Sequence, residues 1–61
     1  MKIKKSDSFV CIKEVKMDSG VIEYLKGVVY HSDIKHCITD QGGNARHVWS
    51  DLADKYFVKL K

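Results

Sequence analysis

Short runs of β-branched and aromatic residues recur along this chain, and a polar turn ends each of them. In the first run Phe9, Cys11 and Val15 share one face, while Val10 and Ile12 point to the other. Side chains of a strand alternate between the two faces of a sheet, so this pattern predicts a first strand from Phe9 to Val15.

The second run extends from Val21 to about His31 and is interrupted once, at Gly27. A turn at 18–20 precedes it. A glycine inside a strand marks a bulge or a sharp bend, so we expect the strand to bend at Gly27. A bulge there brings Val29 inward, whereas strict alternation turns a different set inward, and both registers stay open. The inward set under strict alternation is Ile22, Tyr24, Val28 and Tyr30.

The second half of the chain predicts a hairpin. Two short strands, at 36–39 and 45–49, flank the segment Asp40–Asn44. Two glycines and an asparagine in this segment supply the left-handed backbone conformations that a tight connection requires. It is therefore the clearest hairpin loop in the sequence.

A short helical turn and a final strand follow the hairpin. Ser50 or Asp51 can cap a helical turn over residues 52–56, which is too short to be an independent helix. In the fifth strand we expect Val58 and Leu60 to point inward.

These elements predict one small all-β domain over residues 1–61, in which residues 1–7 form a flexible basic N-terminus. An open five-stranded sheet leaves two edges unpaired, and closing it into a barrel removes that exposure. We therefore expect a five-stranded barrel with one short helical turn before the last strand.

The order of elements resembles the small barrels of the SH3-like class. The likeness rests on the bend at Gly27, the hairpin at Asp40–Asn44 and the turn at Ser50–Tyr56 before the last strand, and it covers roughly residues 8 to 60. It implies an SH3-like barrel. The proline-binding members of that class carry an Ala-Leu-Tyr-Asp-Tyr-type opening and a tandem tryptophan, and this chain has neither. The resemblance therefore does not extend to recognition of proline-rich peptides.

A narrower resemblance is to short uncharacterised proteins of Bacteroides-type gut bacteria and their phages. It rests on three segments: Cys11–Lys13, Tyr24–Tyr30 and His47–Asp51. This likeness implies a phage or prophage origin and a shared fold, and it implies no particular activity.

The composition is that of a folded domain, with 44% hydrophobic and 31% charged residues. No apolar run approaches the roughly 18 residues of a membrane span. The basic start of the chain is followed by Ser6–Ser8 and not by the hydrophobic stretch of an export signal, so we expect a cytoplasmic protein with no membrane contact. In that setting we expect Cys11 and Cys37 to be small buried thiols, because two cysteines are weak evidence for a disulfide framework.

The net charge is +3, and five lysines are concentrated at the two ends of the chain. If the termini lie side by side, these lysines form one basic patch that attracts phosphates or anionic partners. The alternative is that they only keep a small protein in solution. The five are Lys2, Lys4, Lys5, Lys59 and Lys61.

The histidines and cysteines do not have the spacing of a known catalytic or metal site. A structural zinc site requires ligands paired at short spacing, and His36 and Cys37 are adjacent, so a strand turns them to opposite faces. Cys37 and His47 flank one hairpin and can face each other, but a nucleophilic cysteine also requires a pocket and a lowered pKa. We therefore expect no enzyme activity, no cofactor and no metal.

Aromatic and basic residues of the predicted strands suggest a binding surface. Stacking rings beside basic side chains are how small barrels hold single-stranded nucleic acid, and exposed tyrosine or tryptophan also anchors protein partners. The alternative is that Trp49 and one tyrosine fill the core, because aromatic side chains bury the most area. The candidate surface consists of Tyr24, Lys26, Tyr30, Arg46, His47 and Trp49.

From these features we expect a non-catalytic interaction module that binds a protein partner through exposed strand edges and aromatic side chains. The alternative is a small nucleic-acid-binding barrel that uses the terminal lysines, Arg46 and a stacking surface. The sequence does not identify the partner or the oligomeric state.

Overall fold

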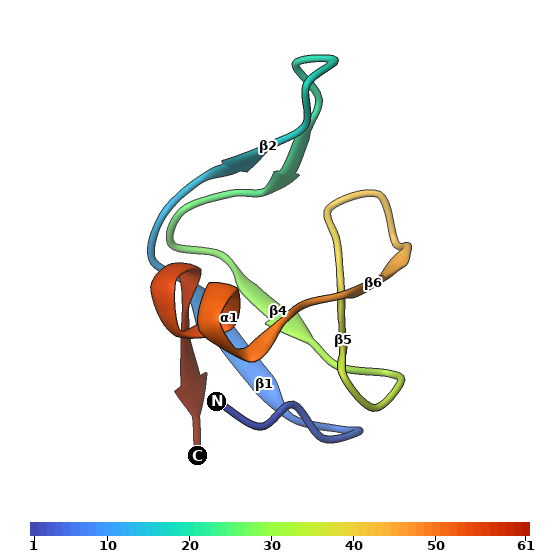
Figure 1. Cartoon of the computed structure of the whole chain (residues 1–61), viewed down its shortest axis with the longest axis vertical. Coiled ribbons are helices and arrows are strands. Elements are labelled where there is room, and N and C mark those ends of the chain that lie inside the picture. Colours follow the sequence, from blue (N-terminus) through green and yellow to red (C-terminus); the bar gives the residue numbers. More distant parts are fainter.

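A computed structural model describes all 61 residues as seven short strands and one helix. The predicted all-β class is therefore confirmed, with a single short helix before the last strand (Figure 1). The elements are β1 (Ser8–Cys11), β2 (Val15–Lys16), β3 (Ile22–Tyr24), β4 (Val29–His31), β5 (Cys37–Thr39), β6 (Ala45–His47), α1 (Ser50–Tyr56) and β7 (Phe57–Leu60).

The strands form three antiparallel sheets. One has three strands in the order β4-β1-β7, and the other two are the β2–β3 and β5–β6 pairs. Phe9, on the central strand β1, lies opposite Tyr30 on β4 and Lys59 on β7. The sheets are open, and together they contain seven strands, whereas five were predicted from the sequence.

The strand count differs because each of the two long runs is broken. Residues 12–14 form a bend between β1 and β2, inside which the Cys11 thiol donates to the Lys13 carbonyl at 3.0 Å. The second run turns at Gly27, whose φ of 86° lies in the left-handed region that glycine adopts freely. The Gly27 amide donates to the Cys11 carbonyl at 2.7 Å, so the predicted bend at this glycine is confirmed.

Aromatic rings form the centre of the core. Tyr24 contacts both Tyr30 and Phe57 edge to face, with ring centroids 5.0 Å apart in each pair. Phe9 and Phe57 meet at 6.3 Å with the same kind of geometry, which aromatic quadrupoles favour. The buried hydrophobic residues are Ile3, Phe9, Cys11, Tyr24, Tyr30, Ile38, Ala53 and Phe57.

In the last strand, β7, the residues predicted to point inward point outward. Val58 and Leu60 are 47% and 40% exposed, whereas Phe57 is buried. The register explains the difference, because Phe57 lies opposite the buried Cys11 and Val58 lies opposite Val10 on the outer face of the sheet. The expectation that the two aliphatic residues point inward is therefore wrong.

The first residues of the chain pack against the rest of the domain. Ile3 belongs to the core, and its carbonyl accepts a hydrogen bond from the His36 amide at 3.1 Å. The Ser6 amide donates to the Ser32 carbonyl at 2.7 Å. A free tail would lack these contacts, so the expected flexible segment 1–7 is held in place along at least part of its length.

Helix α1 begins one residue earlier than a cap at Ser50 would place it. Trp49 occupies the N-cap position with extended backbone and makes no side-chain capping bond, while Ser50 is the first helical residue. Ala53 is the one helical residue that is fully buried. The helix is neither long nor apolar enough to cross a membrane.

Candidate binding groove

Two of the six residues predicted for the binding surface lie in the core. Tyr24 is 3% exposed and Tyr30 is 6% exposed. The Tyr24 hydroxyl donates to the Ile38 carbonyl at 2.6 Å, and the Tyr30 hydroxyl donates to Gln41 Oε1 and accepts from the Leu25 amide, both at 2.7 Å. Because each phenol oxygen has internal partners, both rings can be buried without an unsatisfied polar group. Neither tyrosine therefore contributes to an exposed stacking surface.

The environment of Tyr24 also makes its hydroxyl chemically inert. Burial raises the pKa of the Tyr24 phenol far above its ordinary value, and the nearby Asp40 carboxylate raises it further. The phenol remains protonated and acts as a fixed hydrogen-bond donor.

Two further predicted residues, Lys26 and Arg46, are exposed but lie outside the larger groove described below. Lys26 lies in the exposed turn beside Gly27 and does not line either of the cavities described below. Arg46, on β6, pairs through Nε with Asp40 Oδ2 at 2.9 Å. Arg46 therefore closes the β5–β6 hairpin, which reduces its freedom to bind a ligand.

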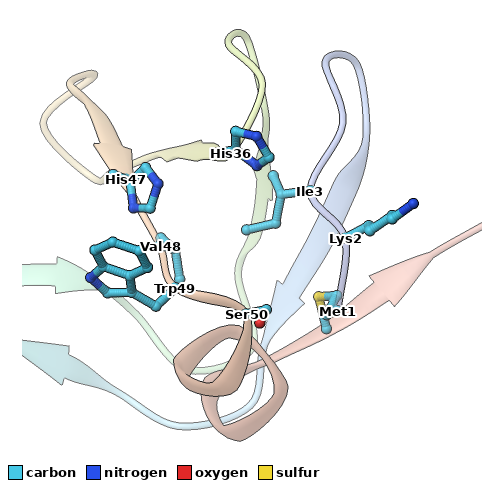
Figure 2. Close-up of a pocket in the computed structure, with 8 residues that line it drawn as sticks. All are labelled: Met1, Lys2, Ile3, His36, His47, Val48, Trp49 and Ser50. Carbon is cyan, nitrogen blue, oxygen red and sulfur yellow. The ribbon is translucent and has the colours of Figure 1, made fainter.

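Three predicted residues, Tyr24, Arg46 and His47, line a smaller cavity described below. The larger groove brings together two predicted residues, His47 and Trp49. Its volume is about 360 Å³. The other contributing segments are the N-terminal residues 1–3, the turn before β5 and the first residue of α1 (Figure 2). The further lining residues are Met1, Lys2, Ile3, His36, Val48 and Ser50.

Backbone hydrogen bonds fix the wall that carries Trp49. The Val48 amide donates to the His36 carbonyl at 3.1 Å, which ties the end of β6 to the turn before β5. The Trp49 carbonyl accepts from the Ala53 amide at 2.9 Å, so Trp49 begins the helix while its own backbone is extended. The indole is thereby positioned at a junction of strand and helix.

His36 is positioned on the opposite wall by an uncommon backbone conformation. Its φ is 69°, in the left-handed region that non-glycine residues seldom adopt. The groups that hold it there are the Ile3 carbonyl, which accepts from its amide, and the Val48 amide, which donates to its carbonyl. Such strained residues are frequent at functional sites. The prediction did not include His36 in the binding surface, because it assumed regular alternation through a strand at 36–39.

The rings of the groove form a connected series. The His47 and Trp49 centroids lie 4.5 Å apart with planes at 64°, and the His36 and His47 centroids lie 6.0 Å apart. Trp49 is 66% exposed. Figure 2 shows the two imidazoles on different sides of the opening, with Ile3 below His36 and the indole beside Val48.

A second, smaller cavity of about 200 Å³ lies on the other side of His47 and Val48, which line both cavities. Its other lining residues include Val15 and Leu52. The end of β6 therefore forms a ridge between two adjacent depressions on the surface.

The condition for a patch of terminal lysines, that the two ends of the chain lie side by side, is met. Strand β1 pairs with β7 so that Ser8 lies opposite Leu60, and the two ends of the chain lie close together (Figure 1). Lys59 Nζ pairs with Asp7 Oδ2 at 2.9 Å and donates to the Lys2 carbonyl at 3.2 Å. One positive charge of the predicted basic patch is thus compensated by a carboxylate. The exposed lysines of the patch that form no ion pair are Lys2, Lys4, Lys5 and Lys61.

Cysteine and histidine side chains are the candidates for nucleophilic chemistry and for metal binding. Cys37 and His47 lie directly opposite each other in the β5–β6 register, as the hairpin predicted. Both cysteines are free, and burial raises the pKa of the Cys11 thiol. No three histidine, cysteine, aspartate or glutamate side chains converge in an arrangement that could hold a metal ion.

Comparison of the chain with protein-family models, with curated proteins and with solved structures finds no match. The residues of the groove and their geometry therefore provide the argument about function.

Proposed function

We propose that this chain is a non-catalytic interaction module that binds a protein partner through the groove beside Trp49. The exposure of this residue is the observation that carries the proposal. Trp49 is the only tryptophan of the chain, and it is 66% exposed at the groove. Tryptophan is among the residues that most often dominate the energy of protein interfaces.

In the isolated domain, much of the free energy available from burying the Trp49 side chain is not gained. A tryptophan side chain buries roughly 150–250 Å² when it is covered. At about 25 cal/mol per Å², the exposed two thirds of Trp49 correspond to roughly 3 kcal/mol of unused burial free energy. A domain of this size has a small core and would benefit from that burial. A partner that covers the indole recovers it.

The SH3-like resemblance is part of this proposal. Support comes from the pairing of the first and last strands and from the helix placed just before the last strand. The likeness to short proteins of Bacteroides-type gut bacteria and their phages stays a prediction.

A nucleic-acid-binding function is the second candidate, and the pairing of β1 with β7 favours it by gathering the terminal lysines. Two observations weigh against it. Tyr24 and Tyr30 lie in the core, so Trp49 is the one predicted tyrosine or tryptophan ring available for stacking, with the His47 imidazole beside it. Lys59 is paired with Asp7, and its charge is not free for a phosphate. A protein partner is therefore the better supported proposal.

The experiment compares three immobilised proteins in cell extract: the wild type, Trp49→Ala and Ile34→Ala. Ile34 is a matched control because it is also exposed and hydrophobic but lies outside both cavities. We expect a partner that the wild type and Ile34→Ala retain and that Trp49→Ala loses.

Because Trp49 is largely exposed, Trp49→Ala should unfold within about 0.5 kcal/mol of the wild type, measured by urea denaturation. This shows that a lost partner is not a consequence of unfolding. Identical partners for Trp49→Ala and the wild type would overturn the proposal. A partner that nuclease treatment releases, with binding that weakens steeply as salt rises, would favour the second candidate.

A further inference from the structure

The ionisable side chains that line the groove are all basic. They are Lys2, His36 and His47, and no carboxylate lines the groove. The Met1 α-ammonium belongs to another lining residue, and it forms an ion pair with Asp54 Oδ1 at 3.1 Å. In Figure 2 the Lys2 side chain extends outward at the rim, whereas the two imidazoles border the opening.

Apart from Ser50, the remaining lining is apolar. Ile3, Val48 and Trp49 offer a surface that an aliphatic side chain can cover. The groove volume of about 360 Å³ falls near the lower end of the range for ligand pockets, roughly 300–1,000 Å³. It therefore accommodates a short segment of an extended chain and not a large folded element.

We propose that the groove binds an extended acidic peptide segment in which a carboxylate neighbours an apolar side chain. This inference rests on the proposed function and names the chemistry of the ligand. The apolar side chain packs against Trp49 and Val48. The carboxylate accepts hydrogen bonds from the ring N–H groups of His36 and His47, which line the same groove.

Complementarity of charge argues for an acidic ligand over a basic one. A basic segment would meet like charge at Lys2 and would find no carboxylate in the groove. The net charge of +3 for the whole chain acts in the same direction at longer range.

The test uses the fluorescence of Trp49, which is the sole indole and reports directly on the groove. The probes are three blocked pentapeptides with the sequences Gly-Glu-Leu-Glu-Gly, Gly-Gln-Leu-Gln-Gly and Gly-Lys-Leu-Lys-Gly, each titrated to millimolar concentration. We expect the glutamate peptide to bind about tenfold more tightly than the glutamine peptide, because a charge-assisted hydrogen bond is lost in the latter.

Two histidine variants locate the contact. His47→Gln should weaken the glutamate peptide about tenfold while leaving the glutamine peptide unchanged. His31→Gln is the matched control, because His31 is an exposed histidine on β4 outside the groove. His36→Asn retains a residue type that tolerates the left-handed backbone and should behave like His47→Gln.

Equal affinity for the acidic and neutral peptides, or tighter binding of the lysine peptide, would overturn the acidic-ligand inference while leaving the interaction module intact. If no peptide alters Trp49 fluorescence, the inference is overturned too. The proposed function would still hold in that case if a partner from cell extract binds the wild type and is lost in Trp49→Ala. An octathymidylate that quenches Trp49 more strongly than the glutamate peptide assigns the groove to nucleic acid and overturns it as well.

Discussion

Asp40 and Arg46 form an ion pair across the β5–β6 hairpin, with 2.9 Å between Oδ2 and Nε. The other carboxylate oxygen of Asp40 accepts hydrogen bonds from the amides of Gly42 and Asn44, at 3.0 and 2.9 Å. The Asp40 side chain is almost fully buried, whereas that of Arg46 is partly exposed. One buried carboxylate thus organises both the loop and the strand that leads to Trp49.

We predict that Asp40→Asn lowers the free energy of unfolding by about 1–3 kcal/mol, because it removes the charge that the Arg46 guanidinium and two amides stabilise. Urea denaturation followed by circular dichroism measures the loss. Glu14→Gln is the matched control, since Glu14 is exposed and forms no ion pair, and it should change stability by less than about 0.5 kcal/mol. Equal stabilities for the two variants would contradict the role assigned to Asp40.

The same carboxylate predicts how stability depends on pH. Burial alone would raise the pKa of Asp40, but the hydrogen bonds from Asn44, Arg46 and Gly42 outweigh it and hold the pKa below its ordinary value of 3.8. The hydrogen bond from Lys59 likewise lowers the pKa of Asp7. A carboxyl whose pKa is depressed in the folded state adds stability above its unfolded pKa and loses it as the pH falls through the folded value.

We therefore expect the contribution of these two carboxylates to stability to be present above their ordinary pKa of 3.8 and to be lost as the pH falls below it. Thermal unfolding across this range measures the effect. Asp40→Asn should flatten part of the acid limb, since the titrating group is gone. An acid limb as steep as that of the wild type would show that other groups are responsible.

The buried Tyr30 hydroxyl allows a test of how much its hydrogen bonds contribute to the stability of the core. Tyr30→Phe leaves the Leu25 amide and Gln41 Oε1 without their partner, so we predict a loss of about 1–3 kcal/mol in the free energy of unfolding. Tyr56→Phe is the control, because Tyr56 is half-buried and its hydroxyl forms no hydrogen bond within the protein. Chemical denaturation should separate the two variants clearly, and indistinguishable midpoints would refute the prediction.

At Gly27, a substitution should strain the backbone without causing a steric clash. Its φ is 86°, and an added Cβ would meet no atom within 4 Å. Gly27→Ala should therefore cost roughly 1–2 kcal/mol through strain in the left-handed conformation alone. Gly27→Asn should cost less, because asparagine tolerates that region better. Equal losses for both substitutions would argue that the turn relaxes to another conformation.

Local signals in the sequence predicted local structure well. The loop at Asp40–Asn44 carries its own turn chemistry, and it connects β5 to β6 as expected. The bend at Gly27 and the short helix before the last strand are also as predicted, because glycine and the strand-breaking residues around Ser50 act within a few positions. Alternation likewise put Phe9 and Cys11 on the same face of the first strand, and both are buried in the core.

Properties that depend on tertiary packing were not predictable in the same way. Whether Tyr24, Tyr30 or Trp49 fills the core depends on hydrogen-bond partners such as the Ile38 carbonyl, which lies 14 positions from Tyr24. His36 was weighed as a zinc ligand but was not placed in the binding surface, because its left-handed backbone breaks the alternation that the prediction assumed. The groove itself combines residues 1–3 with residues 47–50, which no periodic pattern connects.

The central strand β1 has both of its hydrogen-bonding edges occupied, one by β4 and the other by the last strand β7. Phe9 therefore depends on partners located 21 and 50 positions later, Tyr30 and Lys59. Contacts so distant along the chain make loop closure the slow step of folding. A growing polypeptide can complete this sheet only after β7 has emerged from the ribosome, so β1 should wait for about 50 further residues before both of its edges are paired.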